Sequence, residues 1–329
     1  MPDPFPVQRA HTIQATSDHT RWLIDGLWGY DAVGILGGEP KCCKSLCALT
    51  MAVSVASGRS CLGGHRPLRT GTVLVFAAED APHIVRERLA LLSAGLDIDL
   101  HDIPIQIITA PSLRLDCEND RQRLALTVAA HAPVLLILDP FVRLHRVDEN
   151  VAGEVAPILA GLRQLQRTHG CAVLVVHHAR KGAAGVRAGQ ALRGSSEFHA
   201  WGDSNLFLRR QQGALTLDVE HRAAPAPDPI RLALEATEHR MILAGDRPDE
   251  PEAPDSDGAP AARLVAFLAA AASPCTRRQI QAGLQLRAAT VGAALEQLHA
   301  QGRILRDTQG YRLPAGGGAA VNSASAAVC

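Results

Sequence analysis

The sequence predicts an α/β protein in which helices cover both faces of a mostly parallel β-sheet. Two observations lead to this prediction. Continuous apolar runs recur along the chain, and segments with helical periodicity lie between them. Strands that are apolar on both faces are typical of parallel sheets buried between two helix layers. The predicted buried strands are residues 32–36, 72–78, 103–108, 134–138 and 172–176, and the predicted helices include 46–56, 121–130 and 155–168.

Further segments extend this core at both ends. Short alternating stretches predict antiparallel strands added at the edge of the sheet. Ahead of the first strand, residues 22–28 hold an apolar cluster that we expect to pack beside that strand. The alternative for this cluster is stacking on adenine or contact with another subunit. The stretches predicted as added strands are residues 205–209, 214–220, 230–236 and 240–243.

The chain also divides by composition. Residues 1–20 are polar and aperiodic, which predicts a loose lead-in to an α/β domain over residues 21–245. Residues 246–261 combine prolines with closely spaced acids and predict an extended linker. Residues 262–314 predict three helices and a hairpin, the pattern of a small winged-helix domain. The Ala- and Gly-rich residues 315–329 predict a disordered tail.

Composition and charge exclude several classes of protein. Of 329 residues, 47% are hydrophobic and 20% charged, an ordinary balance for a soluble globular protein. The formal net charge is zero, so contact with nucleic acid needs a local basic patch. We expect no signal peptide and no membrane span, because no apolar run is long enough for either. The eight cysteines form no C-x-x-C pair, which favours reduced thiols, a cytoplasmic location and no structural zinc.

The first predicted strand leads into a candidate phosphate-binding loop. Its residues fit the pattern G-x-x-x-x-G-K-[ST] except that Cys43 replaces the second glycine. In such a loop, backbone N–H groups surround the phosphates of ATP, the lysine reaches the terminal ones, and the serine binds Mg²⁺. We expect Cys43 to take helical angles while Gly37 and Gly38 supply the flexibility. The predicted nucleotide-binding residues are Gly38, Glu39, Pro40, Lys41, Cys42, Cys43, Lys44 and Ser45.

The two cysteines of this loop suggest sensitivity to oxidation. Cys42 and Cys43 precede a helix and lie beside Lys41 and Lys44 in sequence. A helix N-terminus and neighbouring cations favour thiolate. We therefore expect a mild oxidant to block nucleotide binding reversibly.

Polar residues end the other predicted strands, and ligands of parallel α/β sheets bind at those carboxyl ends. Asp139 ends an apolar strand as a Walker B carboxylate does, and we expect it to hold Mg²⁺ mostly through water. Pro140 follows instead of a second acid, so the base must come from elsewhere, and Glu79 is placed to orient the attacking water. His177 and His178 end the fifth strand and could sense the terminal phosphate. The alternative for the pair is a structural role.

Candidate DNA contacts lie in two places. Residues 182–194 are rich in Gly, Ala and Arg and predict a flexible loop that grips DNA. Arg193 is the first candidate for an arginine that acts on phosphates across a subunit interface, with Arg209 or Arg210 behind it. The winged helix would place its third helix in the major groove, the alternative being a protein-interaction module. The predicted DNA-binding residues are Lys181, Arg277, Arg278, Arg287, Thr290, Arg303 and Arg306.

Several short motifs occur in the order found in RepA-like hexameric helicases, which are RecA-fold, AAA-type P-loop ATPases. These motifs are Lys44-Ser45, Ala78-Glu79-Asp80, Leu138-Asp139-Pro140, Asp148-Glu149-Asn150, the stretch His177 to Gly182, and Arg193-Gly194-Ser195-Ser196. The chain resembles this family from about Trp22 to about Arg210. Two departures are Cys43 in the loop and Asp203 near the position where the plasmid helicase is expected to carry an interface arginine.

The resemblance implies a RecA-type core that uses ATP and Mg²⁺ and assembles into a homo-oligomeric ring, in this family a hexamer. It implies DNA as partner, which we expect to be single-stranded at the core. The basic winged helix, outside the region of resemblance, would bind duplex DNA. It also implies catalytic roles for Glu79, Asp139, His177 and His178. We therefore expect ATP hydrolysis coupled to a replicative-helicase-type role in replication or mobile-element maintenance. The alternatives are a recombination or regulatory ATPase that does not unwind DNA, and a nucleotide-binding module with little hydrolysis.

Overall fold

The computed structural model describes the protein in two compact units, Met1–Pro248 and Asp249–Cys329. The described residues are 5–13, 21–178, 197–211, 214–245 and 260–271, together with short stretches between 274 and 313, namely 274–276, 279–280, 284, 291, 294–295, 298–299, 303–307 and 310–313. The predicted linker, except for its last residues, and the predicted tail lie outside them.

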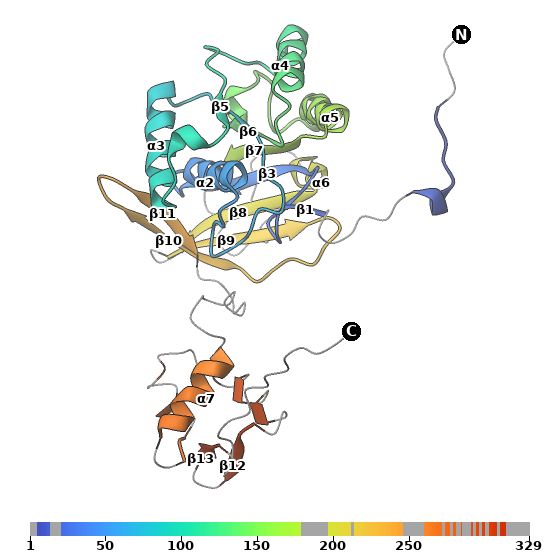
Figure 1. The fold of residues 1–329 in the computed structure, drawn as a ribbon. Coiled ribbons are helices and arrows are strands. Elements are labelled where there is room, and N and C mark those ends of the chain that lie inside the picture. Colours follow the sequence, from blue (N-terminus) through green and yellow to red (C-terminus); the bar gives the residue numbers. More distant parts are fainter. Residues whose placement is uncertain are drawn as a thin grey trace, which may run out of the picture. The chain divides into compact units, whose positions relative to one another are not determined.

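The first unit is organised by a nine-stranded sheet with the order β11-β10-β9-β8-β3-β7-β6-β4-β5 (Figure 1). The strands from β8 to β5 in this order are parallel, and β9, β10 and β11 are antiparallel. The sheet is therefore α/β and mostly parallel, as predicted. The strands are β3 (Val33–Gly38), β4 (Val73–Ala77), β5 (Ile105–Ile107), β6 (Leu135–Asp139), β7 (Ala172–His178), β8 (Ser204–Gln211), β9 (Ala214–His221), β10 (Ile230–Ala236) and β11 (Met241–Gly245).

One strand runs in a direction that the sequence analysis did not predict. We expected residues 205–209 to be antiparallel, but β8 pairs with β3 in parallel, Leu206 opposite Leu36 and Leu208 opposite Gly38. The connection between β7 and β8 is long and includes helix α6 (Glu197–Trp201), so it can bring the chain back to the same end of the sheet. The carboxyl end of β8 therefore lies at the same sheet edge as the loop after β3.

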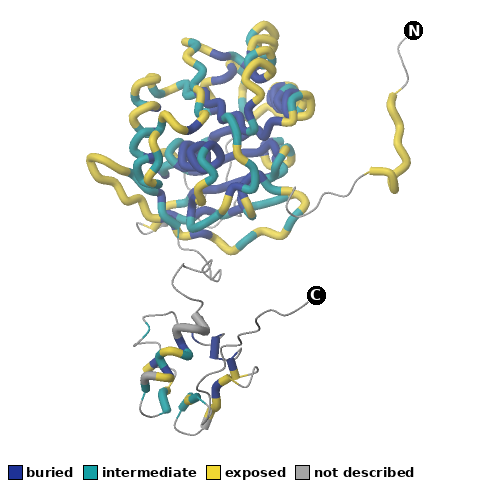
Figure 2. The backbone as a smooth tube through the Cα atoms, in the orientation of Figure 1, coloured by how far each residue is buried: buried dark blue, intermediate teal, exposed yellow. Residues whose placement is uncertain are grey.

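Helices cover the two faces of the sheet. Alternate residues of β7 separate into two clusters: Leu174 and Val176 pack with α2 and α3, whereas Val173 and Val175 pack with α4 and α5. The centre of the unit, including the sheet and α2, is buried (Figure 2). The helices are α2 (Lys44–Ser57), α3 (Pro82–Gly95), α4 (Glu118–His131) and α5 (Ala152–His169), and short 3-10 helices are η1 (Ala10–Thr12), η2 (Leu100–Asp102) and η3 (Phe141–Arg143).

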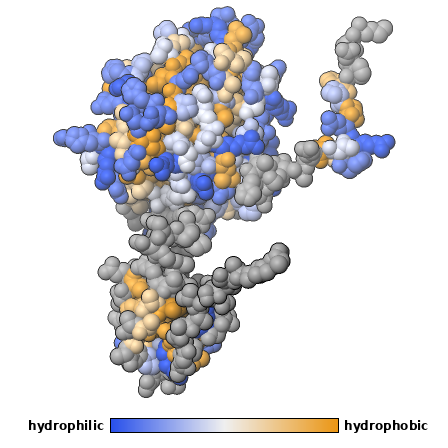
Figure 3. Space-filling model, in the orientation of Figure 1, coloured by the Kyte–Doolittle hydropathy of each residue, from blue (hydrophilic) through white to orange (hydrophobic). Residues whose placement is uncertain are grey.

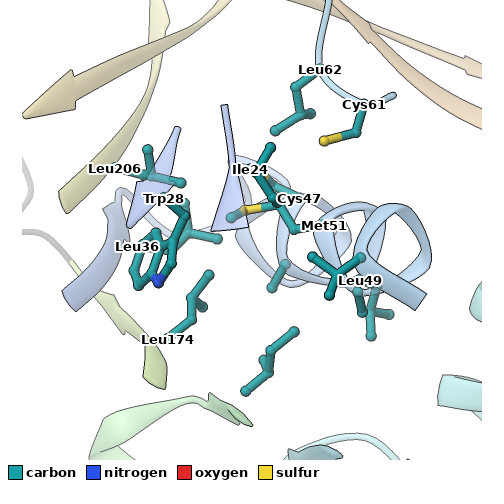
Figure 4. Close-up of a cluster of buried hydrophobic side chains, with 14 of the residues drawn as sticks. Ile24, Trp28, Leu36, Cys47, Leu49, Met51, Cys61, Leu62, Leu174 and Leu206 are labelled. Atoms are coloured by element: carbon teal, nitrogen blue, oxygen red, sulfur yellow. The ribbon is translucent and has the colours of Figure 1, made fainter. Parts of the chain in front are cut away.

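The apolar cluster ahead of β3 is part of the core. It forms a small hairpin from β1 (Trp22–Ile24) and β2 (Trp28–Gly29), and Trp28 is completely buried. Figure 4 shows Ile24 and Trp28 in the same cluster as Met51 of α2 and Leu36 of β3. The hairpin therefore packs beside the strand that leads into the phosphate loop, which is the first of the two interpretations of this segment.

The second unit has its own small core. Its elements are α7 (Pro260–Ala270) and a hairpin of β12 (Leu305–Asp307) and β13 (Gly310–Arg312). Thr276 and Gln279 form a capping box: the Gln279 amide oxygen accepts from the Thr276 backbone N–H at 2.8 Å. The helix predicted over residues 276–283 lies largely outside the described residues. The buried core residues of the second unit include Leu264, Leu268, Ile280, Val291, Leu295, Leu298 and Ile304.

The surface of the first unit is mixed. In Figure 3 its rim is mostly hydrophilic, and apolar side chains reach the surface in a band over the region of β5 and α2. None of the helices among the described residues has both the length and the hydropathy needed to cross a membrane.

Candidate nucleotide site

The loop between β3 and α2 has the close packing of a phosphate-binding turn. A Cβ atom on Gly38 would lie 2.5 Å from the carbonyl oxygen of Leu208 and 2.7 Å from Cys42 Sγ. Any side chain at this position would therefore displace the neighbouring backbone of β8. The first glycine of the motif is required by this contact.

Cys43 does not take the helical angles that we expected. Its φ is 65° and its ψ 25°, which is the left-handed conformation, and Lys41 in the same loop has φ 64°. Gly37 and Gly38 pair with β7 and β8 as strand residues. Gly38 has a φ of 155°, which glycine adopts more readily than other residues, so it supplies part of the flexibility expected of it. Cys43 is the N-cap of α2, so the chain enters the helix from this loop through a left-handed residue. A non-glycine residue in that conformation costs about 1 kcal/mol or more.

The lysine of the motif folds back over its own loop. Lys44 is only 5% exposed, and its Nζ donates to the carbonyl oxygens of Gly38 at 2.9 Å and Glu39 at 2.7 Å. Burial lowers the pKa of Lys44, and the nearby Cys42 and Asp139 oppose this shift. A buried cation held by two neutral carbonyls has a strong electrostatic preference for an anion such as a phosphate.

The Walker B carboxylate lies beside the serine of the loop. Ser45 and Asp139, which ends β6, both line the same cavity. Burial raises the pKa of Asp139 to about 6. The Asp80 and Glu79 carboxylates add to this rise, and the neighbouring Ser45 hydroxyl and Lys44 oppose it. Two further carboxylates therefore lie close enough to Asp139 to affect its pKa, and a divalent cation bound beside Asp139 would interact favourably with all three.

Glu79 is held close to Asp139 by the backbone. The Ala78 N–H donates to the Asp139 carbonyl oxygen at 2.7 Å, which joins the carboxyl ends of β4 and β6. The Glu79 Oε1 accepts from Arg143 Nε at 2.8 Å. Glu79 therefore lies at the edge predicted for it, paired with an arginine that the sequence analysis did not single out.

These side chains line one cavity of about 370 Å³. The cavity brings together predicted residues from the phosphate loop and from the carboxyl ends of β4, β6 and β7. Of the predicted loop residues, Gly38, Glu39 and Pro40 are not part of its lining. Asp80 and Arg88 also line it, and they form an ion pair at 2.5 Å that the sequence analysis missed. The predicted residues in the lining are Lys41, Cys42, Cys43, Lys44, Ser45, Glu79, Asp139 and His178.

The two histidines of the predicted sensor lie on opposite faces of β7. His178 continues the face of Leu174 and Val176 and lines the cavity. His177 continues the face of Val173 and Val175, is 1% exposed and stacks on Phe198 with ring centroids 4.3 Å apart. Since side chains alternate along a strand, both cannot face the phosphate loop. His178 is therefore the candidate sensor, and His177 occupies the structural position.

The arginine candidates lie in different surroundings. Arg209 pairs with Asp218 at 2.9 Å. The next residue of β8, Arg210, has an Nη atom 3.8 Å from Sγ of Cys43 in the phosphate loop of the same chain. Asp203, at the position where an interface arginine was expected, pairs with Arg163 and with Arg222. Lys181 and Arg193 lie outside the described residues.

The prediction of thiolate at Cys42 is not supported. Cys42 is 2% exposed, and burial raises the pKa of its thiol despite the charge and hydrogen bond of Lys44. Burial outweighs the cation because the sulfur lies inside the packed loop. The oxidation hypothesis therefore finds no support in Cys42.

The winged-helix candidates are only partly within the described residues. Arg303 and Arg306 are exposed, and the Arg306 guanidinium lies 5.6 Å from the centroid of the Tyr311 ring. The remaining four, Arg277, Arg278, Arg287 and Thr290, lie outside the described residues.

The donor set of the cavity fits Mg²⁺ better than a transition metal. Within the described part of the chain, no group of three or more His, Cys, Asp and Glu side chains is arranged to hold a metal. Magnesium usually takes one or two protein oxygens and completes its shell with water and phosphate oxygens. Ser45 and Asp139, which both line the cavity, supply such oxygens.

Comparisons with known proteins agree with this geometry. Residues 2–184 match the family described as AAA domain. One solved structure of similar fold is a DnaB-like replicative helicase, studied for its interactions with primase, with a TM-score of 0.51 and 13% sequence identity. The match covers 65% of this chain and 59% of the helicase chain, so this chain spans less than two thirds of that protein. At this identity the likeness establishes the fold, a RecA-like core.

Proposed function

This chain belongs to the AAA-domain family, and from that premise we propose that it is a magnesium-dependent ATPase that acts on DNA. The single observation that carries the proposal is the cavity at the carboxyl ends of the parallel strands. It holds a phosphate-loop lysine and serine, a Walker B carboxylate and a second carboxylate in one place. Four groups of complementary chemistry at one sheet edge are much more specific than one motif.

Lys44 and Ser45 would bind the nucleotide. The Lys44 ammonium exchanges its two carbonyl partners for oxygens of the terminal phosphates, a stronger charge-assisted interaction. The N-terminus of α2 adds its N–H groups and its dipole. Cys43 sets the turn into this helix, so its left-handed backbone decides how well the N–H groups converge on the phosphates.

Ser45 and Asp139 would hold Mg²⁺. The bound ion would neutralise charge on the β- and γ-phosphate oxygens during transfer. Asp139 keeps its carboxylate ionised at neutral pH, although its pKa is raised by burial, because that pKa is about 6.

Glu79 would act as the base. Its carboxylate accepts a proton from the water that attacks the terminal phosphorus, the bond to the bridging oxygen breaks, and ADP and phosphate leave. His178 lies on the central strand between β3 and β6, from which its ring can contact the terminal phosphate. Glu79 must give up, or share, its bond to Arg143 to take this role.

Assembly and partners form the wider part of the proposal. The fold neighbour is a replicative helicase, which favours a homo-oligomeric ring, a hexamer, and single-stranded DNA at the core. The core is residues 21–245, and residues 262–314 form a winged helix that binds duplex DNA through Arg303, Arg306 and the other candidates named above. The chain works in the cytoplasm. Arg193 remains the first candidate for the arginine that acts across the interface.

A second candidate function is nucleotide binding with little hydrolysis. Two observations favour it: the strained Cys43 in place of glycine and the pairing of Glu79 with Arg143. The two functions differ in one measurement, the turnover of bound ATP.

Nucleotide binding and turnover of the Glu79→Gln variant test the proposal. We expect the variant to bind Mg-ATP with the affinity of the wild type, because Lys44 and Ser45 are unchanged, and to lose turnover. Binding without turnover in the wild type would support the second function. Normal hydrolysis by Glu79→Gln would show that the base is another residue.

A further inference from the structure

Three titratable side chains that the proposed function does not use lie together behind the nucleotide cavity. His145 and His177 are buried, and the side chain of Glu149 is 16% exposed. Nε2 of His145 lies 3.4 Å from Oε1 of Glu149. We propose that His145, Glu149 and His177 form a proton-dependent lock, in which a protonated imidazole pairs with the Glu149 carboxylate and ties the β6–α5 connection to β7.

In the motif Asp148-Glu149-Asn150, the two outer residues build a turn and the middle one points inward. Oδ1 of Asp148 accepts from the backbone N–H of Asn150 at 2.9 Å and from its side-chain amide at 2.8 Å. The backbone N–H of Asp148 donates to Glu154, in the first turn of α5, at 2.9 Å. Asp148 and Asn150 are exposed, whereas the Oε1 atom of Glu149 is shielded from solvent. The turn therefore carries one carboxylate into the interior.

Aromatic rings form the walls around the two imidazoles. Phe141 and Phe198 are both completely buried. The ring centroid of Phe141 lies 4.4 Å from that of His145 and 5.9 Å from that of His177. Phe198, in α6, stacks on His177 with centroids 4.3 Å apart. Three segments thus enclose the cluster, namely η3 with the residues that follow it, β7 and α6, and an unpaired charge among these rings would be costly.

The histidines act on the charge of Glu149. Burial alone would raise the pKa of Glu149, but the neighbouring His145 and the charges of His177 and His178 outweigh burial and lower that pKa. The carboxylate is therefore ionised at neutral pH, and a cation has to balance it in this apolar surrounding. A protonated His145 would be that cation, because its ring lies beside the carboxylate.

Most of the other charged groups around the cluster have different partners. The Arg114 guanidinium donates to the backbone carbonyl oxygen of His145 at 3.1 Å, and His199 of α6 pairs with Glu220 at 2.8 Å. The titratable or charged groups on the surrounding elements are Arg114, Arg143, Arg146 and Asp148 of the connecting segments, Glu154 and Arg163 of α5, Glu197 and His199 of α6, and His178 of β7.

The lock has a pH range that follows from its two partners. It needs Glu149 ionised, and because the pKa of Glu149 is lowered from 4.5, this condition holds at pH 6 and above. It also needs a protonated imidazole, and imidazoles lose their proton as the pH rises above neutrality. The stabilisation by the lock is therefore present in mildly acidic solution and is lost as the pH rises toward 8.5.

Urea unfolding of the full chain, followed by tryptophan fluorescence, tests the pairing. The three tryptophans, Trp22, Trp28 and Trp201, all lie in the first unit, so the signal reports on that unit alone. A double-mutant cycle of Glu149→Gln and His145→Gln should show a coupling of about fivefold or more in the unfolding constant at pH 6, and of less than about twofold at pH 8.5. Titration of Asp139, whose pKa is about 6, affects all four proteins alike and cancels in the cycle.

Glu87→Gln is the matched control for the cycle, because Glu87 is an exposed acid of α3, on the other face of the sheet. We expect it to show no coupling to His145→Gln at either pH. Absence of coupling between Glu149 and His145 at pH 6, or coupling of equal size at pH 6 and pH 8.5, would overturn the proposal.

Hydrogen exchange of the folded full chain gives a second readout, which reports local opening instead of global unfolding. We expect Glu149→Gln to speed the exchange of residues 141–151 by about fivefold at pH 6 and by less than about twofold at pH 8.5, each compared with the wild type at the same pH. Helix α3 is the internal reference and should exchange alike in both proteins. Neither measurement uses nucleotide, so both decide on the lock whether or not the chain hydrolyses ATP. Unchanged exchange of residues 141–151 in Glu149→Gln at pH 6 would contradict the lock.

Discussion

Asp139 and Ser45 lie together in the lining of one cavity, although one ends β6 and the other lies in the first turn of α2. Their side chains are close enough for Ser45 to lower the pKa of Asp139, so the Walker B strand and the phosphate loop meet before any ligand is considered. Burial raises the pKa of Asp139, and the charges of Asp80, Glu79 and Lys44 act on it as well.

Asp139→Asn should stabilise the protein at neutral pH when Mg²⁺ and nucleotide are both absent. The pKa of Asp139 is raised from 3.8 to about 6, so the folded state binds the proton more tightly than the unfolded state does. The stability that this group contributes is present below pH 3.8 and is lost as the pH rises through about 6. We expect the variant to gain on the order of 1 to 2 kcal/mol at pH 7 and nothing at pH 3.5, as measured by urea unfolding. A gain of the same size at both pH values would contradict this explanation.

Cys43→Gly should stabilise the loop. Glycine adopts a φ near 65° without the steric cost that a Cβ imposes, which is about 1 kcal/mol. We expect a higher free energy of unfolding and tighter ATP binding, measured by urea unfolding and by titration with nucleotide. Cys43→Ala is the control, because it removes the sulfur and keeps the Cβ. If alanine and glycine gave equal gains, the sulfur and not the backbone would be the cause.

Lys44→Met should abolish ATP binding with little loss of stability. The buried ammonium gives up two hydrogen bonds to Gly38 and Glu39, but removing a cation whose pKa is lowered by burial offsets that loss. We expect ATP affinity to fall by roughly 100-fold or more and the free energy of unfolding to change by less than about 1 kcal/mol. Arg59→Met is the control, because Arg59 is an exposed cation shortly after α2 and does not line the cavity. Equal losses of affinity in the two variants would indicate a general charge effect.

His177→Ala and His178→Ala should affect different properties of the protein, stability in the first case and turnover in the second. His177 stacks on Phe198 in the core, so its removal should cost about 2 kcal/mol of stability. His178 lines the cavity, so its removal should lower turnover and leave the unfolding free energy nearly unchanged. Thermal unfolding and ATP turnover of both variants distinguish the two roles. A larger loss of stability in His178→Ala would reverse the assignment.

Much of the fold follows from local patterns in the sequence. The apolar runs gave β3, β4, β6 and β7 because strands buried on both faces need apolar residues throughout. The positions of Asp139 and Glu79 at one edge could be predicted because the carboxyl ends of parallel strands lie at the same edge of the sheet. The separation of His177 from His178 was also available, since counting alternate residues from Ala172 assigns them to different faces.

Other features depend on the packed three-dimensional structure and cannot be predicted from local sequence patterns. The left-handed Cys43 follows from how the loop must turn into α2, and residue preferences alone favour helical angles there. The burial that raises the pKa of Cys42 opposes the effect of its charged neighbours, and only the packed loop shows which is larger. The pairing of Arg143 with Glu79 joins two segments far apart in the chain, and no local pattern indicates it.

The central claim is that this cavity hydrolyses ATP in response to DNA. ATP turnover by the full chain, measured with and without single-stranded DNA in the wild type and in Glu79→Gln, tests it most directly. The account predicts turnover that rises when single-stranded DNA is added and that Glu79→Gln abolishes in both conditions. Turnover that is equal with and without DNA, or that persists in Glu79→Gln, would contradict it.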